Sequence, residues 1–285
     1  MKTRFRLVLL SLTASAALAA ADFRDHLGLS LFSLRAETRK SATGALDLVR
    51  SYGIKEVELS ATGGLAPAQF GAELRSRGLV PVSSKVQYKF FEEDVAAVIR
   101  DAQTLGLKFL VVPSASIPGD REFTAALARE AAAKFNAWGE ACKQAGIRLA
   151  YHTHGVEFRP TAAGNGETVF DVFVRETNPE LVCFELDAFW VHYAGQDAVK
   201  LLRKYPNRWA MISIKDMRKN LATGFHTGRA PPGAKATVGQ GQIDYGPILR
   251  AAQEIGVQHY FLGDDTSTPL ESIPESLRYL RGLKL

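Results

Sequence analysis

Hydrophobic and polar positions along this chain follow two periods. Short apolar runs, typical of buried β-strands, are separated by longer segments in which apolar residues recur at helical spacing. The predicted strands cover residues 27–33, 54–60, 79–85, 108–114, 148–154, 181–187, 209–215 and 259–265. Strand and helix therefore alternate from residue 27 onward. This order predicts parallel strands that are connected by helices.

The number of strand-helix units favours a closed barrel. Eight units in a chain of 285 residues fit the usual size of a (β/α)8 barrel. A doubly wound open sheet is the main alternative, but it more often has a glycine-rich phosphate turn after its first strand. Residues 31–42, LFSLRAETRKSA, contain no G-x-G-x-x-G. We therefore predict one α/β domain, a (β/α)8 TIM barrel, over residues 22–285.

The first 21 residues have the three regions of a secretory signal peptide. Lys2, Arg4 and Arg6 precede an apolar run, and small residues follow up to Ala21. The apolar run is too short for a comfortable membrane span, and an uncleaved anchor is the alternative. We expect cleavage near Ala19 or Ala21, export to the periplasm or the medium, and no membrane attachment of the mature protein.

Net charge and cysteine content give little support for a nucleic-acid partner or a disulfide. The formal net charge is +5, and removal of three basic residues with no acidic one among residues 1–21 lowers it to +2. A charge this small gives no reason to expect nucleic acid as a partner. Cys142 lies in a helical pattern and Cys183 in a predicted strand, so a disulfide between them is not favoured.

Residues 148–158, RLAYHTHGVEF, combine a strand pattern with polar chemistry. Side chains alternate along a strand, so His152 and His154 project from the same face. Gly155 lets the backbone turn, and Glu157 can then fold back over the histidines. A single histidine at a strand end is usually a packed or hydrogen-bonded residue, but two with a nearby acid favour a site.

In a (β/α)8 barrel the reacting groups lie at the carboxyl ends of the strands. Several predicted strands of this chain supply titratable side chains there, and one face of the second strand carries Glu56 and Glu58. The candidates are Arg35, Glu56, Glu58, Lys85, Glu185, Asp187, Lys215, Asp264 and Asp265. Such a polar mouth suits a polyhydroxylated small molecule.

Two segments after the strands add candidate substrate contacts. Trp190 and His192 follow the sixth strand, where an aromatic ring can stack on a sugar or merely pack a helix. Residues 217–244 form the one long connection. Long connections in compact domains are usually functional, so we interpret this one as a lid that carries His226 and Arg229 to the mouth. A plain mobile linker is the alternative.

Five segments together resemble a known family. They are YHTHGVEF, FELDAFWVHYAGQD, IKDM, the loop TGFHTG with VGQGQIDYGPIL, and HYFLGDDTSTPLESIPESLRYL. The sequence resembles the sugar phosphate isomerase/epimerase family of xylose-isomerase-like TIM barrels over nearly all of the mature chain. The resemblance implies a single barrel, a divalent cation such as manganese at its mouth, and proton transfer next to a sugar carbonyl, including dehydration or lyase chemistry.

The resemblance also assigns metal-ligand positions, and this chain departs from several. The strand-five ligand falls at His152, followed by Glu157 in an acidic position, and the strand-six aspartate falls at Asp187. The strand-seven histidine falls at Ser213 and the strand-eight glutamate at Gly263, neither of which is a good ligand. A strand-three histidine is replaced by Lys85. We therefore expect any metal to bind weakly through His152, Glu157, Asp187 and Asp265, or Asp264.

Three functional classes remain open from the sequence. The first is an exported isomerase, epimerase or lyase, with His154, Glu157 and Lys215 as catalytic groups and Lys215 as the substitute for the metal if none is bound. The second is a sugar-binding protein that has lost the metal and the chemistry. The third is a phosphodiester-cleaving enzyme similar to abasic-site endonucleases, which need a crowded multi-metal site and a basic face. The first is favoured, with free sugars or glycosides as substrates.

Overall fold

The computed structural model describes residues 22–114, 117–118, 123–164 and 166–285. Eight parallel strands close into a barrel in the order β1-β10-β7-β6-β5-β4-β3-β2. They are β1 (Leu27–Ser30), β2 (Glu56–Leu59), β3 (Val80–Lys85), β4 (Phe109–Pro113), β5 (Arg148–His152), β6 (Val182–Asp187), β7 (Trp209–Ile214) and β10 (His259–Leu262). The predicted (β/α)8 barrel is confirmed. The predicted signal peptide, residues 1–21, lies outside the described residues.

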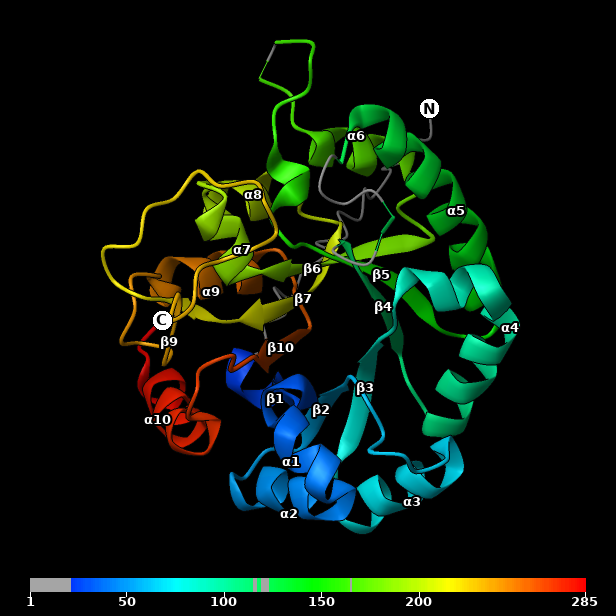
Figure 1. Ribbon diagram of the computed structural model, residues 1–285, viewed down its shortest axis with the longest axis vertical. Coiled ribbons are helices and arrows are strands. Elements are labelled where there is room, and N and C mark those ends of the chain that lie inside the picture. Colours follow the sequence, from blue (N-terminus) through cyan, green and yellow to red (C-terminus); the bar gives the residue numbers. More distant parts are fainter. Residues whose placement is uncertain (1–21, 115–116, 119–122, 165) are drawn as a thin grey trace, which may run out of the picture.

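Helices surround the barrel and alternate with its strands (Figure 1). They are α1 (Arg35–Lys40), α2 (Ala42–Ser51), α3 (Pro67–Ser76), α4 (Tyr88–Leu105), α5 (Ala125–Gln144), α6 (Val169–Glu176), α7 (Ala188–Tyr193), α8 (Ala198–Lys204), α9 (Tyr245–Glu254) and α10 (Pro269–Gly282). Local sequence signals set several ends, such as the capping box of Thr168 and Asp171 at the start of α6. None of the helices in the described segments combines the length and apolarity that crossing a membrane requires.

The hydrophobic core has two layers. Side chains that point into the barrel form the inner layer: Val82, Phe109, Val111, Ala150, Cys183, Ala210, Met211 and Phe261. A larger cluster fills the space between the strands and the helices. Cys183 belongs to the inner layer and Cys142 is buried on α5, and both are free thiols. The barrel is therefore a packed core, and the open space for a ligand lies at its ends.

Some strands are shorter than predicted at the mouth, so their predicted ends were wrong. β1 ends at Ser30 because Leu31–Leu34 turn into a 3-10 helix. β5 ends at His152 and β10 at Leu262, where the chain leaves the sheet. His154 and Asp265 therefore lie on loops rather than on strands.

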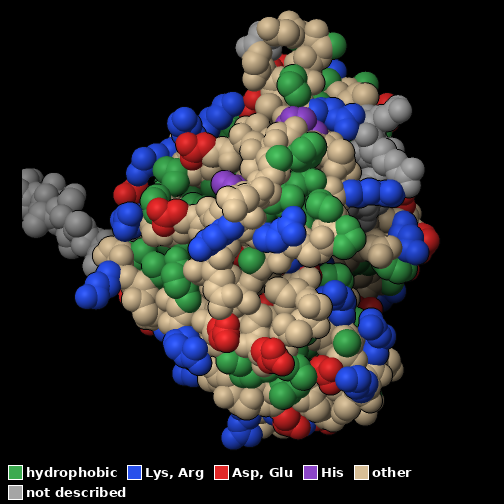
Figure 2. Space-filling model, turned by 60° about the vertical axis from the view of Figure 1, so that its left-hand side comes forward, with side chains coloured by type: hydrophobic (Ala, Val, Ile, Leu, Met, Phe, Trp, Pro, Cys, Tyr) green, Lys and Arg blue, Asp and Glu red, His purple; other side chains and the backbone are tan. Residues whose placement is uncertain are grey.

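The long connection after β7 contains structure of its own. β8 (Asp216–Met217) pairs with β9 (Lys235–Ala236) in antiparallel fashion. The buried Asp216 carboxylate accepts hydrogen bonds from the backbone N–H groups of Met217, Gly239, Gly241 and Ile243, at 2.7–3.1 Å. The segment is thus fastened at both ends. Figure 2 shows the side of the molecule that carries it, with basic, acidic and hydrophobic side chains interspersed on the surface.

Candidate active site

A cavity of about 250 Å³ opens at the carboxyl ends of the strands. Its walls come from widely separated parts of the chain that the barrel brings together. The lining residues are Ser30, Phe32, Ser33, Ser60, Lys85, Gln87, Pro113, His152, His154, Lys215, Gly263 and Asp265. Five predicted site residues, namely Lys85, His152, His154, Lys215 and Asp265, therefore meet at this cavity, which we call the mouth cavity.

Lys215 stands between two carboxylates at the mouth cavity. Its Nζ lies 3.1 Å from Asp187 Oδ2 and 3.2 Å from Asp265 Oδ2. Burial opposes the charge, but the two carboxylates outweigh it and raise the pKa of Lys215 well above its usual value, so the side chain is an ammonium ion.

Gly263 makes room for Lys215. A Cβ atom at residue 263 would lie 2.7 Å from Lys215 Cε and 3.1 Å from its Cγ. A glutamate at this position, which the family resemblance implied, would displace the lysine from the mouth. Glycine in place of the family's glutamate therefore leaves the space that the Lys215 ammonium occupies.

Lys85 forms a second ion-pair group deeper in the barrel. Its Nζ lies 2.6 Å from Glu58 Oε1 and 3.6 Å from Glu185 Oε1. Burial and the neighbouring Glu185 raise the pKa of Glu58. The pKa of Glu185 is lowered to about 2, because Lys85 and His152 outweigh its burial. The ammonium of Lys85 thus balances two carboxylates that no solvent reaches.

His152 connects the two ion-pair groups. Its Nδ1 lies 2.8 Å from Glu185 Oε2 and its Nε2 lies 3.4 Å from Asp187 Oδ2. Burial and Lys85 lower the pKa of His152, but the two carboxylates outweigh them and raise it. Asp187 also caps α7, with Oδ1 accepting from the backbone N–H of Trp190 at 3.1 Å. Acidic and basic groups therefore alternate across the mouth in the order Glu58, Lys85, Glu185, His152, Asp187, Lys215 and Asp265.

His154 is the neutral histidine of the mouth. Burial lowers its pKa to about 3, and its ring lies 4.2 Å from the Trp190 ring, tilted by 33°. Its Nδ1 is buried and has no hydrogen-bond partner within the described structure. The neutral imidazole also lines the mouth cavity, where it can donate a hydrogen bond to a ligand or accept one from it.

Glu157 supports His154 and does not line the mouth cavity. Its carboxylate accepts from the backbone N–H of His154 at 2.8 Å and from Ser114 Oγ at 3.3 Å. Burial raises the pKa of Glu157 to about 7. Gly155, with φ of 93°, makes the turn between the two residues. The predicted catalytic and metal roles of Glu157 are not tested by this placement and stay predictions.

Lys235 is a mouth residue that the sequence analysis missed. It comes from β9, and its Nζ lies 2.8 Å from the centroid of the Phe189 ring and 4.4 Å from that of Trp190. Burial and the charge of Lys215 lower its pKa to about 7. The one available signal was a single lysine within the small and apolar stretch PPGAKATV.

A second cavity, of about 730 Å³, lies beside the mouth cavity and shares Asp265 with it. Trp190, Lys235 and residues 228–234 form much of its wall, so the long connection does reach the mouth. Arg229 lines this cavity, and Arg35 lies at the rim with Nη1 3.6 Å from Asp265 Oδ1. The predicted substrate contacts through Arg35, Glu58, Lys85, Trp190 and Arg229 stay predictions. Glu58 lies beneath Lys85, fully buried.

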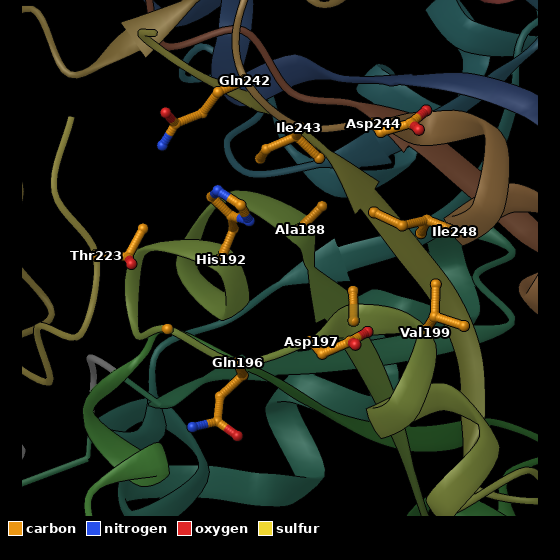
Figure 3. A pocket seen from close by; sticks show the side chains of 12 residues that line it. Ala188, His192, Gln196, Asp197, Val199, Thr223, Gln242, Ile243, Asp244 and Ile248 are labelled. Carbon is orange, nitrogen blue, oxygen red and sulfur yellow. The ribbon is translucent and has the colours of Figure 1, made fainter. Parts of the chain in front are cut away.

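Two further predicted residues lie away from the mouth cavity. His192, on α7, lines a separate cavity of about 400 Å³ that the starts of α8 and α9 also border. Figure 3 shows His192 there with Thr223 and Gln242. The backbone carbonyl of His226 accepts a hydrogen bond from Arg159 Nη2 at 3.2 Å. The structure does not place either side chain among those that line the mouth cavity.

The residues at the mouth do not fit the divalent cation that the family resemblance implies. Both ring nitrogens of His152 already face carboxylates, and Glu157 is hydrogen-bonded away from the cavity. The Lys215 ammonium stands between Asp187 and Asp265, where a cation between these carboxylates would lie. In the described part of the chain, three His, Cys, Asp or Glu ligand atoms approach within 4.8 Å of one another elsewhere, at His26, Glu56 and His259.

Curated relatives match one part of the chain. Two inosose dehydratases are examples: one from Clostridium perfringens is 27% identical over 157 residues, which is 51% of this chain and 51% of that protein. One from Lacticaseibacillus casei is 25% identical over 143 residues, which is 48% of this chain and 46% of that protein. The chain thus matches about half the length of these relatives.

The whole fold is shared with solved structures and with a protein family. A sugar phosphate isomerase/epimerase from Parabacteroides distasonis superposes with a TM-score of 0.73 at 22% identity, covering 90% of this chain and 98% of that one. The family described as xylose isomerase-like TIM barrel matches residues 46–283. That match includes the strands that supply Glu58, Lys85, His152, Asp187 and Lys215 to the mouth. This chain therefore belongs to the xylose isomerase-like TIM barrel family.

Proposed function

We propose that this protein is a sugar-modifying enzyme that moves a proton at a carbon next to the carbonyl of a sugar or sugar derivative. The observation that carries the proposal is the Lys215 ammonium, held between Asp187 and Asp265 and facing the mouth cavity. Isomerases, epimerases and dehydratases of carbonyl sugars share this step. The names of the matched proteins, inosose dehydratase and sugar phosphate isomerase/epimerase, support the class.

Lys215 takes the part that a divalent cation plays in many proton-transfer enzymes. Removal of a proton next to a carbonyl leaves an enolate, with negative charge on the former carbonyl oxygen. A fixed ammonium beside that oxygen stabilises the charge without reorganisation, because the two carboxylates already hold it in place. The Lys85 ammonium, which also lines the mouth cavity, adds to the positive potential there.

Asp265 is the group that accepts the proton in this proposal. Lys215 and Lys235 outweigh its burial and lower its pKa, so the carboxylate is ionised. It borders both cavities. His154, in its neutral form, holds a substrate hydroxyl. Phe32 lines the mouth cavity and Trp190 the cavity beside it, where each ring can contact a sugar.

The first 21 residues bear on where the enzyme acts. Residues 1–21 have the order of regions found in secretory signal peptides, so we propose that the enzyme acts outside the cytoplasm on free sugars or glycosides. Phosphorylated intermediates are scarce there. Isomerase and dehydratase chemistry start from the same enolate and differ in whether a hydroxyl leaves from the neighbouring carbon.

Exchange of substrate hydrogen with deuterated water tests the proposed function. The purified protein is incubated with ketoses, aldoses, oxidised glycosides and inososes, and the signal of the hydrogen next to the carbonyl is followed by NMR. We expect that hydrogen to exchange in one substrate class, and Lys215→Met to slow the exchange by roughly 100-fold or more. The matched control is Lys200→Met, an exposed lysine on α8, which should exchange at the wild-type rate.

Product analysis of the same reactions decides between isomerase and dehydratase, since only a dehydratase releases water from the substrate. A protein that binds one of these sugars but exchanges no hydrogen in any of them would be a sugar-binding protein. That result would contradict the proposed enzyme activity.

A further inference from the structure

At the end of the barrel opposite the mouth, three titratable side chains meet. His26 directly precedes β1, Glu56 is the first residue of β2, and His259 is the first residue of β10. β1 pairs with both β2 and β10, so the amino ends of these three strands are neighbours. The group lies apart from the mouth cavity and uses none of its residues.

The two histidines share one carboxylate. His26 Nδ1 lies 2.9 Å from Glu56 Oε1, and His259 Nδ1 lies 2.7 Å from Glu56 Oε2. The candidate ligand atoms of all three residues lie within 4.8 Å of one another. The imidazole rings stand nearly perpendicular, at 81°, with centroids 5.3 Å apart. The candidate ligand atoms thus lie close enough together to share one ion.

The group is rigid on one side and open on the other. The ring of His259 is packed against Phe109 at 5.8 Å and Phe261 at 6.3 Å. The side chain of His259 is 3% exposed and that of Glu56 14%, whereas that of His26 is 42% exposed. An ion can therefore enter from solvent past His26 and meet two ligands that are already held in place.

Charge favours a cation at this point. Glu56 brings a carboxylate group, and each of its two oxygens lies within hydrogen-bond distance of an imidazole nitrogen. Unlike the carboxylates of the mouth, Glu56 has no lysine or arginine among its ion-pair partners in the described residues. Within the described residues, its ion-pair partners are the two imidazoles, which can also bind a metal.

We propose that His26, Glu56 and His259 bind a divalent transition-metal ion of the zinc type. Two imidazole nitrogens and one carboxylate oxygen form a ligand set that such ions prefer, and a water molecule completes the coordination. The proton of each Nδ1 moves to the Nε2 of the same ring, so the ion takes the place of both hydrogen bonds. The ion links the amino ends of β1, β2 and β10, at the end of the barrel where structural roles are expected.

Metal-dependent thermal unfolding of the chain from residue 22 tests this site. Protein freed of metal with EDTA is unfolded with and without added Zn²⁺. We expect Zn²⁺ to raise the Tm of the wild type by about 5 °C. His26→Ala should remove this rise, and because His26 is half-exposed and the Glu56–His259 hydrogen bond remains, the variant should fold. Glu56→Gln should remove it as well.

A mouth variant separates this site from the mouth. Asp187→Asn should keep the rise of Tm with Zn²⁺, and elemental analysis should find one bound zinc in the wild type and in Asp187→Asn but none in His26→Ala. Zinc that is retained by His26→Ala and lost from Asp187→Asn would place the metal at the mouth and overturn the proposal. A wild-type protein that neither binds zinc nor gains stability from it would show that the three residues are a hydrogen-bonded clamp.

Discussion

The two ends of the barrel differ in the groups that balance their carboxylates. At the mouth, Glu58, Glu185, Asp187 and Asp265 are balanced by the ammonium groups of lysines that the chain itself supplies. At the opposite end, Glu56 faces two imidazoles. Lysine is a fixed cation with no lone pair to give to a metal, whereas imidazole is a metal ligand. The positive charge of the mouth is thus part of the protein itself, as lysine side chains. At the opposite end we propose an exchangeable metal ion.

Gly263→Ala should have the largest effect on the mouth. The new Cβ would lie 2.7 Å from Lys215 Cε and would push the ammonium away from Asp187 and Asp265. We expect turnover to fall by roughly 100-fold, the cost of losing an oxyanion-stabilising group. Gly282→Ala, at the end of α10 where a Cβ meets nothing within 4 Å, is the control. Full activity of Gly263→Ala would show that Lys215 does not need its observed position.

Lys235→Met tests a lysine whose buried Nζ has no hydrogen-bond partner among the described residues. Burial holds the pKa of Lys235 at about 7 in the folded protein, against its usual 10.5. Between these pH values the unfolded chain binds more protons, so this residue makes the folded state relatively more stable as pH rises. We expect the gain in Tm of Lys235→Met over the wild type to be largest at pH 7 and to shrink toward pH 10. A difference that does not vary with pH would contradict the low pKa.

Without a bound metal, the cluster of His26, Glu56 and His259 should contribute less to the free energy of unfolding. In EDTA, Glu56→Gln replaces a carboxylate that accepts two hydrogen bonds with an amide that has one oxygen acceptor. We expect a loss of about 1–2 kcal/mol in the free energy of unfolding, measured by urea titration, and no change in turnover. A strong loss of turnover would show that the chemistry at the mouth depends on the opposite end of the barrel. That result would contradict the separate roles of the two ends.

Removal of residues 1–21 should have the smallest effect on either end. N-terminal sequencing of the exported protein should find a start near Asp22, and the shortened chain should keep its Tm and turnover. An intact Met1 in a cytoplasmic fraction would contradict the proposed export.

The sequence was enough to predict the barrel and to bring together five of the residues that line its mouth cavity. Period and spacing locate strands, and parallel strands in a barrel all end on one side, so His152, Asp187 and Lys215 could be brought together without coordinates. Glu56 and Glu58 share a strand face, yet Glu56 opens the strand at the far end of the barrel. Position along a strand decides which end a side chain serves, and a strand's start is hard to place from its pattern.

Contacts made by loops were beyond sequence reasoning. Lys235 reaches the mouth because β9 pairs with β8 and Asp216 fastens the segment, and neither contact has a periodic signal. His192 follows Asp187 closely in sequence, but α7 carries it to another cavity. Glu157 turns toward the backbone of His154 and Ser114 because those donors lie within its reach.

Chelation shows whether the chemistry at the mouth depends on the Lys215 ammonium or on a bound metal. Wild-type protein is dialysed against EDTA, its metal content is measured, and hydrogen exchange of its substrate is followed before and after. The account predicts an unchanged rate in the metal-free wild type and a rate in Lys215→Met that is roughly 100-fold lower whether or not Mn²⁺ or Zn²⁺ is added. Loss of exchange on chelation, with recovery when Mn²⁺ is returned, would contradict it and place a catalytic metal at the mouth.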